Sequence, residues 1–443
     1  MSAVTWPEAR RHARGAARPL GRVRRPLPET LGRTLAVPLV ALSPLPAYDA
    51  AAMDGYAVAG PGPWQLTGRV LAGDPGRPTP LAPGEAVEIG TGAVVPVGAD
   101  AVLPYERATR TGRAVDGPVE PGRHVRRRGE DCPAGREVLP AGTVVNPVVL
   151  GLAASLGHDT LTVHRRPRVG TVLTGTELRT AGIPAAGQVR DAIGPMLPGL
   201  LRSAGAEPAW EIRIADDAST LVAALLRSDA DVLVVCGATS AGAADHLRRA
   251  LDTLAAEVPV RGVACRPGHP QLLAILPDGR FVVGLPGNPY AALAAVLTLL
   301  HPLLGRLAGR AEPPTLTARL AAPVARHHRD TRLVPVVRVG SAALPVGHDR
   351  PGSLWGAAGA DALAVVPPGW AGAEVELLPL PAAGNPLPAP DPTPHEVPDP
   401  TPHEVPDPTP LPVPSPAAAR PVGAPAAGRT RRSDGVVGLS APP

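Results

Sequence analysis

Lysine is missing from this chain of 443 residues, so all 43 strongly basic side chains are arginines. Aromatic residues are scarce as well, at 2% of the sequence, and Phe281 is the sole phenylalanine. We therefore expect a core built from leucine, valine and alanine. Because alanine, glycine, proline and arginine are all abundant, we interpret the absence of lysine first as a compositional bias of the genome. A functional reason is the alternative.

Cysteine is rare, and its spacing excludes two kinds of site. Cys132, Cys236 and Cys265 are odd in number, lie far apart and show no CxxC spacing. This argues against a disulfide framework and against a zinc finger. Reduced thiols in a cytoplasmic protein are the simplest account, and we expect each cysteine to act as a small buried apolar residue.

Long apolar runs and long basic runs are also absent. The arginines near the N-terminus are not followed by the apolar segment of a secretory signal. No stretch approaches the roughly 20 apolar residues that span a bilayer. The net charge is only +4, and no basic stripe is interleaved with aromatics. We therefore expect neither a membrane nor a nucleic-acid partner, whereas a small anionic ligand is compatible with the composition.

The apolar pattern changes along the chain and predicts several domains, as the length does. Short valine and leucine runs between Gly/Pro turns indicate small β-sheets. Continuous apolar strands that alternate with helices indicate a mostly parallel sheet covered on both faces. A Pro-rich tail repeats DPTPHEVP and cannot bury a core, so we expect it to be extended or disordered. The expected ranges are a β-rich region at 1–165, an α/β domain at 166–310, a β domain at 311–382 and the tail at 383–443.

Three apolar runs of the α/β region end in loops that contain Gly175, Gly237 and Gly287. Ligands of parallel sheets bind outside the carboxyl ends of the strands. Glycine lets the backbone approach a ligand closely, and exposed amides can hold a phosphate. We therefore predict a ligand site where these three loops meet.

Several polar residues suit anion or metal chemistry, and each has a plainer alternative. Glu177, beside a tight turn, can ligate Mg²⁺ or be solvated. Asn288 suits the N-cap of a helix whose free amides would favour an anion, or it caps the helix and nothing more. Asp245 can serve a ligand or cap the next helix. Asp54, after a turn-rich run, is either a positioned carboxylate or a solvated one.

Four segments carry a more specific signal through their order and spacing. They are MDGYA from Met53, IGTGAVVPVGADAVLPYE from Ile89, PRVGTVLTGTEL from Pro167 and VVGLPGNP from Val282. Together they resemble the molybdopterin molybdenumtransferases of the MoeA/gephyrin family, over roughly the first 380 residues. The resemblance implies two N-terminal subdomains, the second inserted in the first. It also implies a central three-layer α/β domain that binds molybdopterin.

The same resemblance implies an activity and an assembly. The implied reaction inserts molybdate into adenylylated molybdopterin and releases AMP, with Mg²⁺ as the cofactor. The implied assembly is a homodimer whose cleft lies between the molybdopterin-binding domain of one subunit and the first domains of the other. Molybdopterin adenylyltransferase or molybdoenzymes would be further partners.

Residues that match the family motifs take implied roles. The implied catalytic residues are Asp54, Asp131, Glu177 and Asp245, and those implied to bind the metal are Asp54, Glu177 and Asp245. The implied pterin and phosphate contacts are Gly237, Ser240, Gly242, Gly287 and Asn288. The implied oxyanion or nucleotide contacts are Thr91, Arg266, His269 and Ser353.

Functional positions also depart from the family pattern, and the six departures are Ala51, Thr176, Ile193, Ala243, His269 and Ala291. At His269 the family has a lysine, so a fixed charge is lost. At Ile193 it has an asparagine, so a side-chain donor is lost. A second hypothesis therefore stays open, in which the chain is a degenerate carrier or regulatory paralogue that binds molybdopterin without inserting metal. A third gives the Pro-rich tail a tethering role towards a partner enzyme.

Overall fold

The computed structural model describes residues 3–75, 78–237, 246–372 and 374–381. All of them belong to one compact unit, Met1–Pro388. The predicted Pro-rich tail at 383–443 lies outside the described residues. The same holds for Ser240, Gly242, Ala243 and Asp245.

The central domain is built on a six-stranded sheet in the order β17-β14-β18-β22-β21-β19. Its first four strands are parallel, and the two at one edge are antiparallel to their neighbours. This confirms the predicted, mostly parallel sheet. The strands are β14 (Arg168–Thr174), β17 (Glu207–Ile214), β18 (Val232–Cys236), β19 (Glu257–Val260), β21 (Leu272–Ile275) and β22 (Phe281–Leu285).

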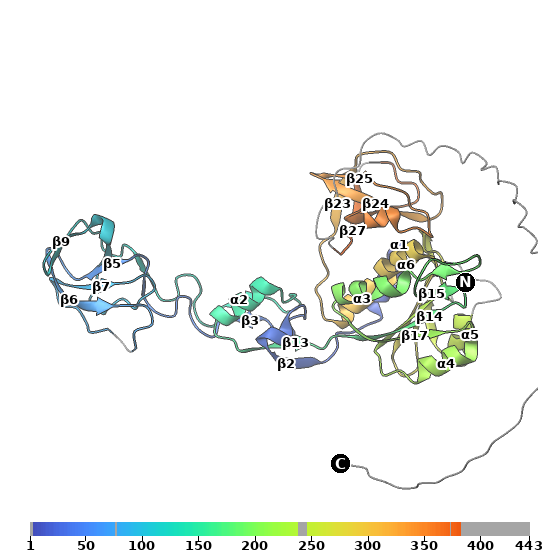
Figure 1. The fold of residues 1–443 in the computed structure, drawn as a ribbon, viewed down its shortest axis with the longest axis horizontal. Coiled ribbons are helices and arrows are strands. Elements are labelled where there is room, and N and C mark those ends of the chain that lie inside the picture. The colour runs from blue at the N-terminus through green and yellow to red at the C-terminus, as the bar shows by residue number, and fades with distance from the viewer. Residues whose placement is uncertain (1–2, 76–77, 238–245, 373, 382–443) are drawn as a thin grey trace, which may run out of the picture. The chain divides into compact units, whose positions relative to one another are not determined.

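Helices cover both faces of this sheet, because alternate side chains of a strand point to opposite sides. Val234 and Val283 pack with α1, α3, α6, η3 and α7, whereas Val235 and Val282 pack with α4 and α5. Figure 1 shows the strands between α3 and α6 on one side and α4 and α5 on the other. The helices are α1 (Trp6–Gly15), α3 (Ile193–Ser203), α4 (Ala218–Leu226), α5 (His246–Thr253), α6 (Pro289–Ala295), η3 (Val296–Leu300) and α7 (His301–Leu307).

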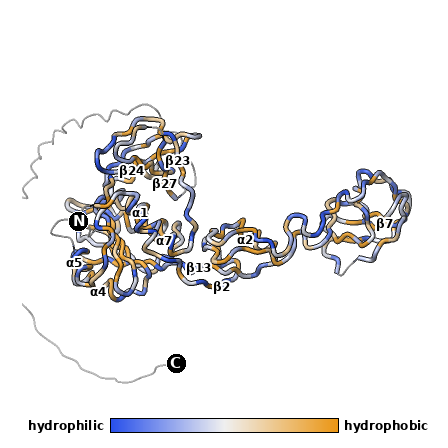
Figure 2. The backbone as a smooth tube through the Cα atoms, turned by 180° about the vertical axis from the view of Figure 1, so that it is seen from behind, coloured by the Kyte–Doolittle hydropathy of each residue, from blue (hydrophilic) through white to orange (hydrophobic). Residues whose placement is uncertain are grey.

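The segments α6, η3 and α7 form one helix of 19 residues, Pro289–Leu307, with a π-helical turn at η3. By length and composition this helix could cross a membrane, so the expectation that no stretch is apolar enough is wrong. However, 78% of its most apolar window is buried inside the protein. It packs between α1 and the central sheet, and a helix buried on most sides is apolar nearly all round. Figure 2 shows the hydrophobic colour of this part of the chain around α7.

The N-terminal region contains two smaller β-rich parts. In the first, the ladders β2–β13 and β3–β12 share a core with α2. The second is a six-stranded sheet in the order β8-β5-β7-β6-β10-β9. The chain enters the second part after β4 and leaves it before β11, and these two strands pair with each other.

The elements of these two parts are short. They are β2 (Arg22–Pro26), η1 (Leu27–Thr30), β3 (Leu39–Val40), β4 (Ala50–Ala51), β5 (Gly55–Val58), β6 (Trp64–Val70), β7 (Glu85–Ile89), β8 (Ala101–Pro104), η2 (Tyr105–Arg107), β9 (Thr109–Thr111), β10 (Ala114–Asp116), β11 (Val125–Arg126), β12 (Glu137–Leu139), α2 (Pro147–Ser155) and β13 (Thr160–His164).

The C-terminal part is a seven-stranded sheet in the order β1-β20-β24-β25-β23-β27-β26. Two strands come from outside the predicted range 311–382, because β1 precedes α1 and β20 follows β19. Through them the C-terminal sheet is tied to the central domain. The elements are β1 (Val4–Thr5), β20 (Val263–Arg266), β23 (Leu316–Leu320), β24 (Thr331–Val339), β25 (Ala342–Pro345), α8 (Trp355–Ala358), β26 (Ala362–Val366) and β27 (Glu374–Pro379).

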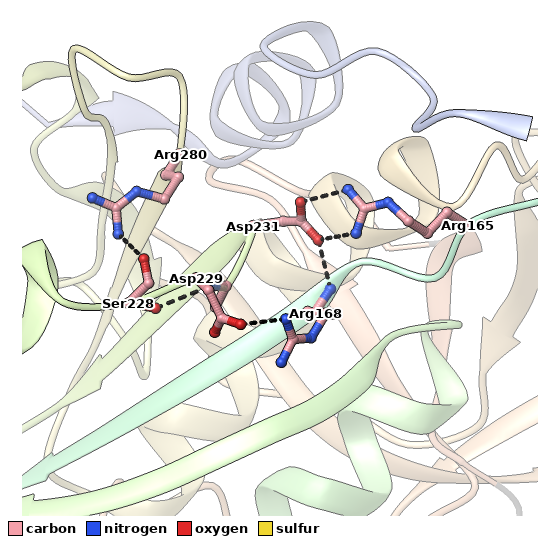
Figure 3. A network of polar contacts seen from close by, with 7 residues as sticks. Arg165, Arg168, Ser228, Asp229, Asp231 and Arg280 are labelled. Carbon is pink, nitrogen blue, oxygen red and sulfur yellow. Dashed lines mark hydrogen bonds and ion pairs between the residues drawn. The ribbon is translucent and has the colours of Figure 1, made fainter.

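A polar network holds the amino ends of the central strands together (Figure 3). The guanidinium of Arg165 donates two hydrogen bonds to the carboxylate of Asp231, at 2.7 and 2.8 Å, which raises the pKa of Arg165. The backbone amide of Arg168 donates to the same carboxylate at 2.8 Å. Arg280 donates to the carbonyl of Ser228 at 2.9 Å. The end of the sheet opposite to the glycine loops is thus fixed by charge-assisted hydrogen bonds.

Replacing Asp231 with alanine should lower the free energy of unfolding by about 2 kcal/mol, because three donors lose a charged acceptor. The shift in thermal midpoint, followed by calorimetry, measures this. Asp229→Ala is the matched control, since Asp229 is an exposed partner of Arg168 and exposed ion pairs contribute under about 1 kcal/mol. Equal midpoints for the two variants would contradict the structural role of Asp231.

Candidate functional site

The three glycine loops meet at the carboxyl ends of β14, β18 and β22. A Cβ atom on Gly237 would lie 2.8 Å from the carbonyl oxygen of Thr174, and the φ angle of Gly237 is +100°. A Cβ atom on Gly287 would lie 3.6 Å from the Cα atom of Gly237. The hydroxyl of Thr174 donates to the carbonyl of Cys236 at 3.1 Å, which fixes two strand ends together. At Gly237 only glycine fits without strain, as expected for a backbone that approaches a ligand.

The start of α6 is less open than the sequence suggests. Asn288 takes the N-cap position, but its side chain makes no capping hydrogen bond. Instead, the amides of Tyr290 and Ala291 donate to the carbonyl of Pro351, at 2.9 and 3.3 Å. The expectation of free amides at this helix end is therefore wrong for these two residues, because a loop of the C-terminal part caps the helix. The side chain of Asn288 faces this loop, with its Oδ1 atom 3.7 Å from where a Cβ atom on Gly352 would lie.

Ser353 belongs to the same loop and helps to shape it. Its amide donates to the carbonyl of Arg350 at 3.1 Å, and its hydroxyl accepts from the amide of Trp355 at 3.3 Å. The side chain is half-buried. The structure thus brings the predicted residues Asn288 and Ser353 into neighbouring positions.

A pair of arginines lies beside the start of α6, and one of them was missed from the sequence. Arg266 ends β20, and its partner in the parallel ladder is Arg332 of β24. The loop after Arg266 packs on α6, since a Cβ atom on Gly268 would lie 3.2 Å from the carbonyl of Ala291. His269, at the end of this loop, is exposed. Two cationic side chains therefore stand next to each other where the resemblance implied one arginine and one histidine.

Both arginines are held by carboxylates. Arg266 donates to Asp330 at 2.8 Å, and Arg332 forms an ion pair with Asp349. These pairs orient the guanidinium groups and neutralise part of their charge. Arginine presents five N–H donors in a planar fork, so each cation keeps donors for a bound oxyanion.

Glu177 follows β14 on an exposed loop. The loop is tied by the short ladder of β15 (Leu178–Arg179) and β16 (Val189–Arg190). The carboxylate folds back over Gly175, whose Cβ atom would lie 2.8 Å from it. Gly175 has a φ angle of +135°, so this close approach also requires glycine. Glu177 is therefore near the glycine loops and open to solvent.

In the second N-terminal part, the structure joins two predicted residues. The carboxylate oxygen Oδ1 of Asp54 accepts hydrogen bonds from the amide of Thr91, at 2.6 Å, and from its hydroxyl, at 2.9 Å. These bonds, the amide first and the hydroxyl second, lower the pKa of Asp54 below its usual value. The side chain is exposed. Asp54 is thus an ionised carboxylate in a fixed orientation, with Oδ2 outside these two bonds.

Asp131 lies in the segment that leaves this part, and its charge is paired. It accepts from Arg126, while Arg127 donates to Asp49 at 2.7 Å across the two connecting segments. In the basic group at Arg126-Arg127-Arg128, the guanidinium groups of Arg126 and Arg127 therefore form ion pairs with carboxylates of the same chain. Asp131 does not stand as an isolated carboxylate, in contrast to Asp54.

Three of the six departures from the family pattern are buried positions. Ala51, Ile193 and Ala291 are exposed by only 2%, 6% and 4%. Ile193 packs in the main core, and the carboxylate of the neighbouring Asp191 accepts from the amides of Ile193 and Gly194, at 3.0 and 2.9 Å, at the start of α3. An apolar side chain at these positions is accounted for by packing.

Among the described residues, the candidates for metal ligation are single carboxylates. Within the described ranges, no group of three or more His, Cys, Asp and Glu side chains is arranged to hold a metal ion. Single carboxylates such as Asp54 and Glu177 suit Mg²⁺, because this ion is commonly bound by one or two carboxylates together with substrate phosphates.

The three cysteines are free and buried as expected. Burial raises the pKa of the Cys265 thiol to about 12.

Known proteins match this chain along the described domains. Three family profiles cover it in succession: the MoeA N-terminal region (domain I and II) at residues 4–157, the probable molybdopterin binding domain at 170–306 and the MoeA C-terminal region (domain IV) at 317–380. The chain is 35% identical over 330 residues to molybdopterin molybdenumtransferase 2 of Mycobacterium tuberculosis, covering 67% of this chain and 80% of the relative.

Two further comparisons agree. The molybdopterin molybdenumtransferase of Synechococcus elongatus is 35% identical over 306 residues, covering 65% of this chain and 75% of that protein. The crystal structure of a molybdopterin biosynthesis MoeA protein from Pyrococcus horikosii superposes with a TM-score of 0.71 at 28% identity, covering 85% of this chain and 99% of that one. The resemblance inferred from four short segments is therefore confirmed, and this chain belongs to the MoeA family of molybdopterin molybdenumtransferases.

Proposed function

We propose that this chain acts in molybdenum cofactor biosynthesis as a molybdopterin molybdenumtransferase, which inserts molybdate into adenylylated molybdopterin and releases AMP. One observation carries the proposal. At the carboxyl end of the central sheet Gly237 and Gly287 meet, and the loop that follows Arg266, the ladder partner of Arg332, packs on α6, which begins just after Gly287. Close backbone approach and fixed positive charge are the two properties that a phosphorylated pterin and an oxyanion need together.

Each part of the site then has a task. Gly237 and Gly287 let the backbone approach the pterin and its phosphates, and Asn288 and Ser353 offer polar side chains beside them. Arg266 and Arg332 attract molybdate and stabilise the charge that develops on the phosphate when AMP departs. His269 is an exposed side chain on the loop that follows Arg266, and its ring nitrogens can form hydrogen bonds to the substrate.

Carboxylates from two parts of the chain complete the proposal. Asp54 and Glu177 are exposed, and the donor set they offer fits Mg²⁺ when substrate oxygens supply the remaining ligands. Mg²⁺ bound there would neutralise the phosphate groups of the substrate. Asp54, held by Thr91, is also placed to orient the attacking oxygen. Asp131 supports the segment that carries this part through its pair with Arg126. Asp245 is proposed to bind the metal and to take part in catalysis, as the resemblance implies.

The cleft is proposed to form between two copies of the chain, as a homodimer in the cytoplasm, with molybdopterin adenylyltransferase or molybdoenzymes as transient partners. A mixing experiment tests this. Asp54→Asn and Arg266→Gln each disable one half of the proposed cleft. If the halves come from different subunits, each mixed dimer has one intact cleft and should recover about half of the wild-type activity, which is about a quarter for a fully exchanged equimolar mixture. No recovery after subunit exchange would show that both halves act within one chain.

The reaction itself is tested with purified protein, adenylylated molybdopterin, Mg²⁺ and molybdate, with AMP release and formation of active cofactor as the two readouts. A carrier without catalysis is the second candidate. It is favoured by one observation, that Arg266 and Arg332 are already paired with carboxylates. A carrier would bind adenylylated molybdopterin in a titration and release no AMP, whereas the transferase should do both.

Arg332→Gln should raise the KM for molybdate by about tenfold and leave the affinity for adenylylated molybdopterin within about twofold, since tenfold corresponds to one lost charged contact of ~1.4 kcal/mol. Initial rates at varied molybdate measure the effect. Arg338→Gln is the matched control, because Arg338 lies on the same strand but pairs with Asp361 near its far end. An unchanged molybdate dependence in Arg332→Gln would remove this arginine from the oxyanion site.

A further inference from the structure

A cavity lies away from the glycine loops. It has a volume of about 760 Å³ and is lined by α1, α7, β23 and β27. Gly305 and Arg306 line it near the end of the helix Pro289–Leu307, whereas the proposed catalytic site lies at the start of that helix. The lining reaches back along this helix to Leu297, and at ~1.5 Å per residue the distance from Pro289 to Leu297 is roughly 12 Å. None of the residues that line the cavity belongs to the proposed catalytic site. The cavity is therefore distinct from the site described above.

The lining of this cavity carries an excess of positive charge. Its arginines are Arg10, Arg11, Arg14, Arg306 and Arg310, and its glutamates are Glu312 and Glu376. Burial lowers the pKa of His301, also in the lining, to about 4, so this side chain is neutral at neutral pH. Five cations thus face two carboxylates, and one of the five, Arg14, forms an ion pair with the exposed Glu312 at 3.2 Å.

Some of these arginines also have structural roles, but the roles use few of their donors. Arg10 donates one hydrogen bond, to the carbonyl of Leu297 at 2.7 Å, and Arg310 donates one to the carbonyl of Ser203 at 2.6 Å. Each guanidinium has five N–H donors. Burial lowers the pKa of both arginines, and at Arg10 the charges of Glu376 and Glu312 partly oppose this effect. The Nε atom of Arg310 is buried with no hydrogen-bond partner.

The remaining walls are apolar. Leu297, Leu316 and Leu378 line the cavity together with Pro313 and Pro314. Its volume falls within the range of about 300–1,000 Å³ that is usual for small-molecule sites. An apolar wall next to an excess of cations favours a ligand that has both an apolar body and a negative group.

We propose that this cavity binds a small organic anion, a molecule with a carboxylate or phosphate group on an apolar body. The negative group would lie against Arg10, Arg14 and Arg306, and the apolar body would lie against the leucine and proline wall. This site does not depend on the transferase proposal, because none of the residues that line it belongs to the proposed catalytic site.

Three probes of one shape test the proposal on the full-length protein by isothermal titration. They are 1-naphthaleneacetate, 1-naphthyl phosphate and the neutral 1-naphthaleneacetamide. We expect at least one anion to bind at one site per chain, at least tenfold more tightly than the amide, and the stronger anion identifies the preferred group. Equal affinity for the amide and both anions, or no binding of any of the three, would overturn the proposal.

A cavity-filling variant ties the binding to this place. A Cβ atom on Gly305 meets nothing within 4 Å, so Gly305→Leu should fill the cavity and keep every arginine. It should abolish anion binding, and Arg14→Gln should weaken it about fivefold. Gly199→Leu is the matched control, since Gly199 is also a helical glycine with open space and does not line the cavity. Anion binding that survives in Gly305→Leu would place the site elsewhere, whereas transferase activity should be equal in both leucine variants.

Discussion

Asp54→Asn should lower kcat for AMP release by about 100-fold or more, which is the scale of loss when one group that acts on the transition state is removed. Asparagine keeps an acceptor for the amide and hydroxyl of Thr91, so the local geometry survives while the charge is lost. The affinity for adenylylated molybdopterin, measured by titration, should change little. Asp116→Asn, an exposed carboxylate on β10 of the same sheet, is the control and should retain full activity.

The pH dependence gives a second readout of the same group. Hydrogen bonds from the amide of Thr91 and then from its hydroxyl hold the pKa of Asp54 below its usual value, so Asp54 stays ionised at lower pH than a free carboxylate. Thr91→Val removes the hydroxyl and keeps the amide. The pKa of Asp54 should then rise part of the way, and the acidic limb of kcat/KM should move to higher pH. A limb that does not move would show that another group controls it.

The local parts of the fold could be predicted from the sequence because their signals are local. The apolar runs Phe281–Leu285 and Ala218–Leu226 correspond to β22 and α4 as the structure has them. The glycine loops that follow the strands were also expected to meet, since parallel strands end at one edge of a sheet. For these elements the sequence pattern and the structure agree, because residues that are neighbours in the chain determine whether a strand or a helix forms.

The pairings that complete the site could not be predicted in this way. Arg332 stands beside Arg266 only because β20 and β24 pair, and Asp330 reaches Arg266 from 64 residues away in the chain. Likewise, Pro351 caps α6 through a contact between distant segments. No periodicity or short motif contains such information, so the sequence pointed to an open helix end that the structure closes.

The departures from the family pattern illustrate the same limit. From the sequence, Ala51, Ile193 and Ala291 read as lost polar contacts and favoured a degenerate carrier. In the structure all three are buried, so apolar residues are what these positions require here. The carrier hypothesis therefore depends on the remaining departures, of which Thr176 and His269 are exposed and Ala243 lies outside the described residues. The transferase remains the better supported function, because relatives named molybdopterin molybdenumtransferase are 35% identical to this chain.

Gly55→Ala should destabilise the part of the chain that carries Asp54, by about 3 kcal/mol, because there is no room for a methyl group. A Cβ atom at this position would lie 2.0 Å from the carbonyl oxygen of Leu103 and 2.9 Å from the Cα atom of Pro104. Both atoms belong to the backbone of β8, which pairs with β5, so neither can move without breaking the ladder. The neighbouring Asp54 would lose its place next to Thr91.

Gly68→Ala is the matched control in the same sheet, since a Cβ atom on Gly68 would meet only the Val87 side chain, at 4.0 Å. Limited proteolysis with mass mapping should find new cleavage sites between residues 52 and 124 in Gly55→Ala and none in Gly68→Ala. AMP release should fall with the first variant and persist with the second. The glycine of the MDGYA segment would then be explained by the close approach of two strands, and its neighbour Asp54 by chemistry. If Gly55→Ala resisted proteolysis and kept full activity, β5 and β8 could not be as close as the structure has them.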